Sequence, residues 1–587
     1  MARKSIKHRY QLGEFFHFGR LGILGIGIFL FGFLIIWKLF SIQVLLHEKY
    51  QTLASSQYDF YRRLHPERGK IFFTQEKNPE NFFPVAGNRE YVLVYANPYL
   101  ISDVPKTVLE LINIFPELEA EKENLLLRLS KSEDPYEPIL HKVSWEKQEL
   151  LKQKNLTGIG FSEESFRYYP ENNIGSHLLG FVSFDGKIQK GQYGVEGFFQ
   201  EELAGKDGYL EAERDAQGSI IGVSDVSYKE AENGADIYLT IDHTLEYYAC
   251  SELNKTVAKY KAKGGSVIIM DPKTGKILVM CGSPDFNPNF YEEATQLENF
   301  NNPAIFNAYE PGSVFKPITM ASAIDQGKVT PETVFEDTGS RQFDRYIIRN
   351  ADDKVYGKAT MTEVLENSIN TGAIFVAESI GVDTFLEYMK KFGFDDRVGI
   401  ELPGEANSNL STLDTHRPIN LATASFGQGI TVTPLQLLAA YGAIANGGKF
   451  MKPFIVAKIM YPHKETIEAH PKEIRQALSQ RSANLISGML VQVVEKGHSK
   501  RAKISGYYIA GKTGTAQIPD PKTGGYSDQT IHTFVGFGPV EDPRFVMLVR
   551  MDQPQGVRFA EGSVVPLFRQ IADFLLKYLE IEPSYTP

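Results

Sequence analysis

The longest apolar run of the chain lies close to its N-terminus. Residues 21–37 carry no charged side chain, and beyond Lys38 the apolar pattern continues to Leu46. A helix of about 20 residues crosses the hydrocarbon of a bilayer, and the charged end of a lysine can reach the interface. The flank ahead of the run is basic, which keeps it in the cytoplasm. The pattern therefore predicts a cytoplasmic tail over 1–20 and a transmembrane anchor over 21–46, with the remainder of the chain outside.

A cleaved signal peptide is the main alternative to this anchor. Its apolar region would span about 7–15 residues and end at small residues. Here the run is longer, and the nearest small-residue candidate, Thr52-Leu53-Ala54, lies beyond the polar residues 47–49. A helix of a soluble core is disfavoured as well, because the run lacks the polar positions that form a solvent-facing side. We therefore favour an uncleaved anchor.

After the anchor the hydrophobic pattern is mixed as far as residue 235. The predicted pieces are a helical segment with one proline break at 106–130, strand-like runs at 157–170 and 176–183, glycine-dense loops and short strands between 186 and 222, and a polar boundary at 228–235. We expect a separate mixed domain over 47–235.

The C-terminal part has strands at both ends and helices between them. The predicted order is a helix at 240–265 with Asp242 near its start, two strands around a turn at 265–282, a largely helical stretch at 313–500, strands at 507–518, 533–540 and 544–552, and a last helix at 564–581. This order indicates an α+β domain over 236–587 that is closed by its two ends, with a central antiparallel sheet flanked by helices.

Composition narrows the classes of function. Hydrophobic residues make up 42% of the chain and charged residues 23%, which is ordinary for globular proteins and excludes disorder as the dominant state. The 62 basic and 72 acidic residues give a net charge of -10, which argues against a generic nucleic-acid binder. Two cysteines exclude a disulfide scaffold and a cysteine-rich zinc module.

The two cysteines could oxidise outside the cytoplasm. Cys250 lies in a predicted helix and Cys281 in a neighbouring predicted strand. The sequence does not give the Cα separation that a disulfide needs. We expect two buried thiols, with a disulfide as the alternative.

The first candidate for chemistry is Ser313-Val314-Phe315-Lys316. Residues i and i+3 of a helix share a face, so the serine and the lysine can meet. Pro317 places a helix start here, because proline is tolerated in the first turn, where free N–H groups favour negative charge. A serine hydroxyl needs an adjacent base, and a neutral lysine can supply one. Ser144-Trp145-Glu146-Lys147 has the same spacing and is interpreted as an exposed helix start.

The second candidate is Ser368-Ile369-Asn370, whose hydroxyl and amide can relay a proton and hold an amine. Ser482-Ala483-Asn484 matches too, so the tripeptide alone is not specific. The third candidate is Lys512-Thr513-Gly514-Thr515, which continues a strand-like run on both sides. The other two Lys-Thr-Gly copies, at 273–275 and 522–524, follow Asp-Pro and are interpreted as turns.

The three motifs in this order, at 313, 368 and 512, are typical of penicillin-binding proteins and class A β-lactamases. The sequence resembles a class B penicillin-binding protein, a membrane-anchored peptidoglycan D,D-transpeptidase, over nearly its whole length. The segments that carry the resemblance are YEPGSVFKPITMASAIDQG (309–327), SFGQGITVTPLQLLAAYGAIANGG (425–448), MDPKTGKILVMCGSPDFNPN (270–289), Arg68-Gly69-Lys70-Ile71, FRYYPENNIGSHLLGFV (166–182) and YGVEGFF (193–199).

The resemblance implies that residues 47–235 form an elongated, dimerisation-like pedestal for the C-terminal domain, and it implies the role of each site residue. Ser313 attacks the D-Ala-D-Ala carbonyl of a donor stem peptide, Lys316 is the general base, and Ser368 and Asn370 complete the proton relay. The backbone N–H groups of Ser313 and Thr515 form the oxyanion hole. The donor carboxylate is held by Lys512, Thr513 and Thr515, with Gly514 allowing close approach. The sequence departs from the commonest family motifs at Val314 and Ile369, and neither departure removes a catalytic atom.

The resemblance also implies partners and location. No cofactor or metal and no nucleic acid is expected. Stem peptides of donor and acceptor strands are the substrates, and β-lactams acylate the serine. No glycosyltransferase module is recognisable in 47–230, so a separate polymerase is needed. A SEDS-type glycan polymerase and other membrane proteins of the wall-synthesis and division machinery are expected, and Gln43 offers the anchor a polar packing position. The expected location is the bacterial inner membrane, crossed once.

Other functions compete with this interpretation. A β-lactamase or β-lactam sensor shares the core chemistry, but a lactamase is usually short and secreted. A scaffold without catalysis is disfavoured because all the catalytic side chains are present. Within the transpeptidases, the FGQG-ITVTPLQ segment and the Arg68 region favour a septal role over an elongation role by resemblance.

Overall fold

The computed structural model describes residues 20–46, 59–131, 134–185, 188–213, 227–520 and 525–586. The predicted cytoplasmic tail as far as residue 19, the Thr52-Leu53-Ala54 segment and the Lys-Thr-Gly copy at 522–524 lie outside the described residues. Two compact units divide the chain: Met1–Pro66 with Lys206–Glu232, and Glu67–Gly205 with Asn233–Pro587. The domain boundaries expected from the sequence stay predictions.

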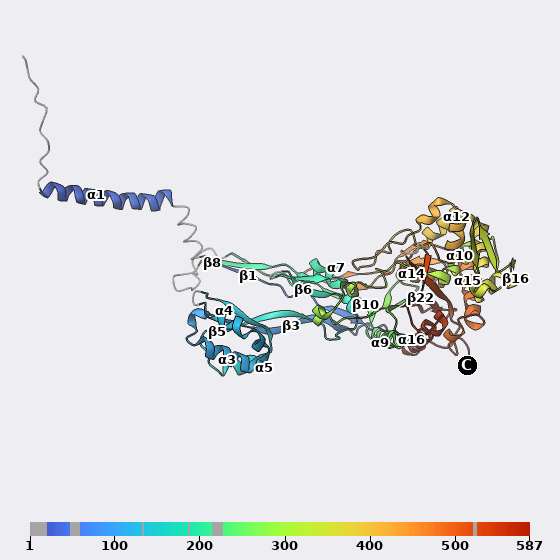
Figure 1. The fold of residues 1–587 in the computed structure, drawn as a ribbon, viewed down its shortest axis with the longest axis horizontal. Coiled ribbons are helices and arrows are strands. Elements are labelled where there is room, and N and C mark those ends of the chain that lie inside the picture. Colours follow the sequence, from blue (N-terminus) through green and yellow to red (C-terminus); the bar gives the residue numbers. More distant parts are fainter. Residues whose placement is uncertain are drawn as a thin grey trace, which may run out of the picture. The chain divides into compact units, whose positions relative to one another are not determined.

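The first unit contains the apolar helix and a small sheet. Helix α1 (Arg20–Phe40) continues into a π-helical turn, η1 (Ser41–Leu45) (Figure 1). The segment Ile23–Leu45 has a mean hydropathy of 2.4 and is long and apolar enough to cross a membrane. Its sheet has the antiparallel order β1 (Asp59–Leu64), β8 (Gly208–Glu213) and β9 (Ser227–Lys229). Strand β9 starts where the polar sequence predicts only a boundary.

The pedestal region of the second unit is built on a seven-stranded sheet. Six strands follow the order β19-β18-β10-β2-β3-β4, and β5 pairs with β3. The strands are β2 (Ile71–Thr74), β3 (Phe83–Ala96), β4 (Glu137–Val143), β5 (Ile159–Tyr168), β10 (Asp236–Asp242), β18 (Val456–Met460) and β19 (Ile467–Glu468). The predicted helical segment with a proline break is confirmed as α3 (Val104–Ile114), a 3-10 turn from Pro116 and α4 (Lys122–Leu129), while α5 (Trp145–Lys152) begins at Ser144.

Two predictions for the pedestal are wrong in part. The run at 176–183 begins as the helical turn α6 (Ser176–Leu179) before strand β6 (Phe181–Asp185), because Gly175 and Gly180 reverse the chain on either side and all four residues of the turn are buried. The glycine-dense stretch contains β7 (Ile188–Gln192) but also two short helices, α7 (Gly194–Phe198) and α8 (Gln200–Ala204).

A buried ion network holds the base of the pedestal together. The carboxylate of Glu196, on α7, is fully buried and accepts a hydrogen bond from Nε of Arg68 at 2.8 Å and from Nε of Arg167 at 2.5 Å. Burial alone would raise the pKa of Glu196, but the two guanidinium groups lower it overall. Arg167 also donates to the carbonyl of Gly69 at 2.8 Å. The network therefore ties the segment before β2 to β5 and α7.

The C-terminal region over 236–587, which contains the three candidate motifs, is organised around a five-stranded antiparallel sheet. Its order is β12 (Ile277–Ser283), β11 (Gly264–Met270), β23 (Phe545–Asp552), β22 (Gly525–Gly538) and β21 (Ala510–Asp520). Because β11 pairs with β23, strands from near the beginning and from the end of the region share one sheet, while the preceding strand β10 belongs to the seven-stranded sheet. This confirms the α+β fold closed by its two ends.

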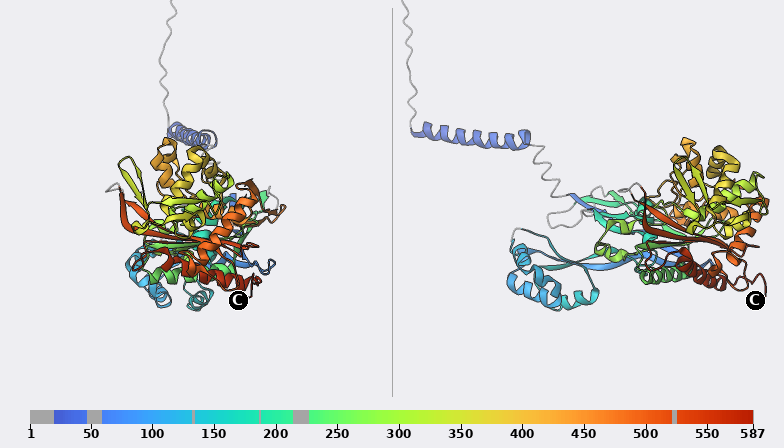
Figure 2. Two further views of the ribbon diagram at one scale, coloured as in Figure 1. Left: turned by 90° about the vertical axis from the view of Figure 1, so that its right-hand side faces the viewer. Right: turned by 45° about the vertical axis from the view of Figure 1, so that its right-hand side comes forward.

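Alternation along the strands sends side chains to two hydrophobic cores. Val267 and Ile269 pack under α9 (His243–Lys259) and α16 (Val564–Tyr578), which lie side by side with Tyr248 stacked on Phe574 (Figure 1). Ile268 lies in the other core, beneath the helices of the middle segment. Figure 2 shows these two groups of helices on opposite faces of the sheet.

The middle segment is largely helical, as predicted. Its helices are α10 (Lys316–Asp325), α11 (Met361–Glu366), α12 (Asn370–Lys391), α13 (Pro418–Ala424), α14 (Pro434–Ala445) and α15 (Gln480–Glu495). It also contains short strands, β13 (Val334–Asp337), β14 (Ser340–Phe343), β15 (Tyr346–Arg349), β16 (Gly357–Thr360), β17 (Lys449–Met451) and β20 (Glu473–Gln476). Several of these are exposed on both faces, so they show no alternation in the sequence.

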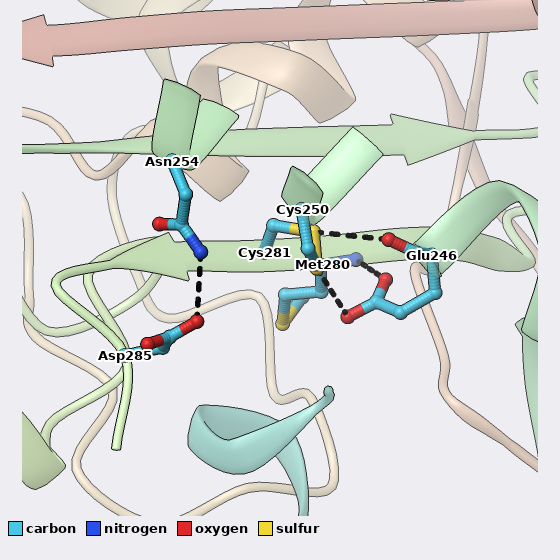
Figure 3. The surroundings of a disulfide bond; sticks show 6 residues. All are labelled: Glu246, Cys250, Asn254, Met280, Cys281 and Asp285. Atoms are coloured by element: carbon cyan, nitrogen blue, oxygen red, sulfur yellow. Dashed lines mark hydrogen bonds between the residues drawn. A yellow bond between two sulfur atoms is a disulfide. The ribbon is translucent and has the colours of Figure 1, made fainter. Parts of the chain in front are cut away.

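The cysteines form a disulfide, so the expectation of two buried thiols is wrong. Cys250 of α9 and Cys281 of β12 lie with their Cα atoms 5.4 Å apart, a distance that the helix packing on the edge strand creates (Figure 3). Glu246, one turn before Cys250, is fully buried beside the disulfide and accepts a hydrogen bond from the N–H of Met280 at 2.9 Å (Figure 3). Burial raises the pKa of Glu246 to about 7.

Candidate active site

Ser313 lies in a tight turn that leads directly into a helix. The turn is a 3-10 helix, η6 (Gly312–Phe315), and regular α-helix begins only at Lys316, so the helix starts three residues later than the sequence predicts. Gly312 has a φ of 63° and its N–H donates to the carbonyl of Gly427 at 3.0 Å. A residue other than glycine would be strained in this conformation. The local backbone therefore holds Ser313 at the entrance of α10.

The amine of Lys316 meets the second motif inside the protein. Its Nζ donates to the main-chain carbonyl of Ser368 and to Oδ1 of Asn370 at 2.8 Å, and lies 3.1 Å from Oγ of Ser368. A neutral amine has two N–H donors and one lone pair. The carbonyl and the amide oxygen, which can only accept, use both donors. The lone pair is therefore left for a hydroxyl proton.

Burial favours the neutral form of this amine. Lys316 is 1% exposed, and desolvation lowers its pKa well below the ordinary lysine value, with a further lowering from nearby Lys512. Desolvation also lowers the pKa of Lys512, to about 7. Burial thus favours the neutral form of both amines, and Lys316 has the additional effect of a neighbouring cation.

Ser368 bridges the two lysines. Its hydroxyl lies 3.0 Å from Nζ of Lys512, whose amine also donates to the carbonyl of Thr513 at 3.1 Å. Ser368 has a φ of 57°, a conformation that is costly for a residue with a side chain and that recurs at functional sites. The motif is thus held in a strained loop between α11 and α12.

The residues that hold this loop were not singled out by the sequence. Asp337, buried at the end of β13, accepts hydrogen bonds from the hydroxyl of Thr371 at 2.6 Å and from Nδ2 of Asn350 at 2.9 Å. Burial alone would raise the pKa of Asp337, but these and further hydrogen bonds lower it overall. The amide of Asn370 also donates to the carbonyl of Arg349 at 2.9 Å. The spacing of residues in the sequence gives no signal for this support, because its residues come from three separate segments.

Strand β21 brings the third motif against the serine turn. A Cβ on Gly514 would lie 2.9 Å from Cγ1 of Val314 and 3.0 Å from the carbonyl oxygen of Pro311, so glycine permits this approach. Thr513 is nearly buried, and Oγ1 of Thr515 accepts a hydrogen bond from the N–H of Ala560 at 3.1 Å. All eight predicted site residues therefore lie on three neighbouring segments: the serine turn with α10, the loop at 368–370, and β21.

The additional copies of the three motifs, the decoy motifs, lie in other elements than these three segments. Ser144 is the N-cap of exposed helix α5 and accepts from the N–H of Lys147. Ser482 lies within the first turns of α15. The Lys-Thr-Gly copy at 273–275 forms the turn between β11 and β12, where Gly275 has a φ of 85°. Within the described residues, these three copies therefore lie in other elements than the cluster of Lys316, Ser368 and Lys512.

One acidic side chain near the serine was also missed. Glu310, three residues before Ser313, accepts hydrogen bonds from the N–H of Gly429 at 3.1 Å and from the hydroxyl of Tyr526 at 2.9 Å. It is half-buried, and burial raises its pKa. The signal in the sequence was its position directly before the serine turn.

Comparison with known proteins agrees with this geometry. A family model described as the penicillin binding protein transpeptidase domain matches residues 265–573, and one described as the penicillin-binding protein dimerisation domain matches 63–239. Stage V sporulation protein D of Bacillus subtilis is 32% identical over 567 residues, which is 95% of this chain and 86% of that protein. Peptidoglycan D,D-transpeptidase FtsI of Escherichia coli is 31% identical over 437 residues, 74% of this chain and 71% of that protein.

Solved structures show the same fold. Penicillin binding protein 2X of Streptococcus thermophilus matches with a TM-score of 0.74 at 21% identity, over 89% of this chain and 81% of that one. Two family models and a relative that covers nearly the full length confirm the resemblance seen in the sequence. This chain belongs to the class B penicillin-binding proteins, which join a dimerisation domain to a transpeptidase domain.

Proposed function

We propose that this protein is a serine-type peptidoglycan D,D-transpeptidase. The observation that supports this most directly is the shared hydroxyl of Ser368, which lies within 3.1 Å of the amines of both Lys316 and Lys512. Such a cluster can accept a proton from a serine and pass it to a leaving group. Relatives with the name peptidoglycan D,D-transpeptidase support the same reaction.

In the first half-reaction, Oγ of Ser313 attacks the carbonyl of the penultimate D-Ala of a donor stem peptide. Neutral Lys316 takes the hydroxyl proton. The main-chain N–H groups of Ser313 and Thr515 are the proposed oxyanion hole, since donors placed at the charge that develops in the transition state lower the barrier. The C–N bond then breaks, and the proton passes through Ser368 to the amine of the departing D-Ala. The terminal carboxylate of the donor is held by Lys512, Thr513 and Thr515, and Asn370 orients the base.

In the second half-reaction, an amine of a neighbouring stem peptide attacks the ester on Ser313. The proton of the attacking amine returns through Lys316 to Oγ of Ser313, and the two strands are joined by an amide bond. A β-lactam would acylate Ser313 in place of the donor. The β-lactam ester on Ser313 is expected to be long-lived, and its lifetime separates a transpeptidase from a β-lactamase.

We infer that the catalytic region works outside the cytoplasm, on a chain anchored once in the inner membrane. The apolar helix Ile23–Leu45 and the basic flank ahead of it support this orientation. A SEDS-type polymerase and division proteins are the proposed partners, because transpeptidation needs newly made glycan strands. The proposed setting is the division septum, an inference from sequence resemblance.

A second candidate setting is spore formation. The relative that covers 95% of this chain is named Stage V sporulation protein D. The reaction would be the same, and only the time of expression would differ. Deletion of the gene would separate the settings, since loss of division and loss of a spore-specific wall are distinct phenotypes.

The test uses the full-length chain in detergent with a fluorescent penicillin. A stable one-to-one adduct that is absent in Ser313→Ala and present in Ser144→Ala, the decoy serine, supports the proposal. Rapid loss of the label with accumulation of hydrolysed drug would instead indicate a β-lactamase. Release of D-Ala and formation of cross-linked product from stem peptides, both abolished in Ser313→Ala, would establish the transpeptidase directly.

A further inference from the structure

The serine turn lies between groups of opposite charge along β21. Val314 packs on Gly514, and a Cβ on Gly312 would lie 3.1 Å from Cβ of Ala516, so the turn and the strand run side by side. Lys512, at one end of this contact, meets Ser368. Beyond Ala516, toward the other end, the side chain of Glu310 meets Tyr526, which pairs with Pro519. Ser313 therefore has the two lysines on one side and a carboxylate on the other.

The carboxylate of Glu310 is fixed in place. It accepts from the main chain of Gly429 and from the hydroxyl of Tyr526, so it joins the serine turn to the 427–429 turn and to the hairpin of β21 and β22. A carboxylate has about four lone-pair positions, so these two hydrogen bonds leave acceptor capacity unused. A pre-positioned, half-buried carboxylate of this kind can bind an ammonium group with little cost in side-chain entropy.

We propose that Glu310 recognises the ammonium group of the acceptor stem peptide. This inference rests on the proposed transpeptidase function and adds the residue that selects the second substrate. The terminal carboxylate of the donor needs a positive charge to bind to, and Lys512, near the N-terminal end of β21, supplies it. The acceptor brings the opposite charge, since a primary amine is protonated at neutral pH. The bound ammonium gives up one proton, by way of the Glu310 carboxylate to solvent, before its lone pair attacks the ester, and the neutral amine then carries the proton that returns to Ser313. The Glu310 carboxylate, which lies near the C-terminal end of β21, is complementary to this ammonium. It lies beside the turn that carries the acyl group.

The ammonium could also come from the donor, if its own side-chain amine reached Glu310. Two donors distinguish these sources. One is a stem pentapeptide with the side-chain amine acetylated, and the other has that amine free. The acceptor is a stem tetrapeptide with a free side-chain amine, and all peptide N-termini are blocked.

The experiment compares the full-length wild-type chain with Glu310→Gln, which keeps shape but removes charge. Glu336→Gln, an exposed carboxylate of β13, is the matched control. With the acetylated donor, Glu310→Gln is expected to raise the KM for the acceptor by roughly 10- to 100-fold, the effect of losing a charge-assisted hydrogen bond. In Glu310→Gln, the amount of cross-linked product should fall relative to hydrolysed donor, while penicillin acylates Ser313 as in the wild-type chain. Glu310→Asp should recover part of the acceptor affinity.

Three results would overturn the proposal. An unchanged ratio of transfer to hydrolysis in Glu310→Gln would show that the charge is not used. An equal fall in penicillin acylation and in transfer would show that Glu310 only holds the serine turn. An effect confined to the donor with a free amine would assign the ammonium site to the donor. Failure of the wild-type chain to form a Ser313 adduct at all would be a failure of the proposed function itself, and it would be visible before any acceptor is added.

Discussion

The hydroxyl of Ser368 lies 3.0 Å from Nζ of Lys512, although 144 positions separate the two residues in the sequence. The same hydroxyl lies 3.1 Å from Nζ of Lys316. One serine thus connects the amine beside the nucleophile to the amine on the sheet. Its backbone, with a φ of 57°, is held in a conformation that the residue would not adopt alone.

Removal of this hydroxyl should slow acylation. Ser368→Ala leaves Lys316 bound to a carbonyl and to Asn370 but breaks the link to Lys512. We expect the acylation rate with penicillin to fall about 100-fold, the usual contribution of a positioned proton-transfer group. Stopped-flow fluorescence on the full-length chain measures this rate. Ser482→Ala, in the decoy Ser-x-Asn motif, is the control, and a rate for Ser368→Ala equal to that of the control would contradict the relay.

The acylation rate should depend on pH in a bell shape. Lys316 must be neutral to take a proton, and burial lowers its pKa, so the rate constant should rise as the pH increases through that lowered value. Lys512 must be charged to hold the donor carboxylate, and its pKa is about 7, so the rate constant should fall above about that pH. The second-order rate constant for penicillin acylation reports the free enzyme. A rate that instead kept rising toward the ordinary lysine pKa would exclude a neutral Lys316 at neutral pH.

Part of this site could be predicted from the sequence and part could not. The i, i+3 spacing of Ser313 and Lys316 and the strand around Lys512 are local patterns, and the structure confirms both segments. The position of Ser368 depends on Asp337 and Asn350, which are distant in sequence and have no pattern of their own. Glu310 lies next to a motif recognised in the sequence. Its role could not be predicted, because its partners Gly429 and Tyr526 come from other segments.

The disulfide illustrates the same limit. The helix around Cys250 and the strand around Cys281 were both predicted, yet their pairing depends on how the helix packs on the edge of the sheet. The short strands of the middle segment were missed because exposure on both faces removes the alternation that marks a strand.

Loss of the disulfide should weaken the catalytic region. The bridge joins residues separated by 31 positions, and closing a loop of this length stabilises the fold by about 3–4 kcal/mol in the chain-entropy account. Cys250→Ser or full reduction should therefore lower the temperature at which the chain loses penicillin labelling. Alkylation under denaturing conditions without reductant is the accompanying check. Modification of two thiols in the wild-type chain would show that the bridge is absent.

Loss of the Glu196 charge should destabilise the pedestal. Glu196→Gln leaves Arg68 and Arg167 buried without a counter-charge, a change that costs about 3–5 kcal/mol when one partner of a buried ion pair is removed. Limited proteolysis should then cut the pedestal at a lower temperature than in the wild-type chain. The exposed neighbour Glu201 provides the control as Glu201→Gln. If the two variants resisted proteolysis equally, the ion network would contribute to the specificity of the fold rather than to its stability.

The pairing of β11 with β23 has a consequence for the timing of synthesis. Strand β11 emerges from the ribosome early, but it stays an open edge until the last strands of the chain are made. Lys512 and Thr515, which the proposed mechanism uses to bind the donor carboxylate and the oxyanion, also belong to those last strands. In the proposed mechanism, Ser313 therefore becomes reactive only after these strands have been made and have paired. A truncated chain that lacks β21–β23 should not be acylated by penicillin. It should also expose the unpaired edge of β11, which chaperones and quality-control proteases can bind.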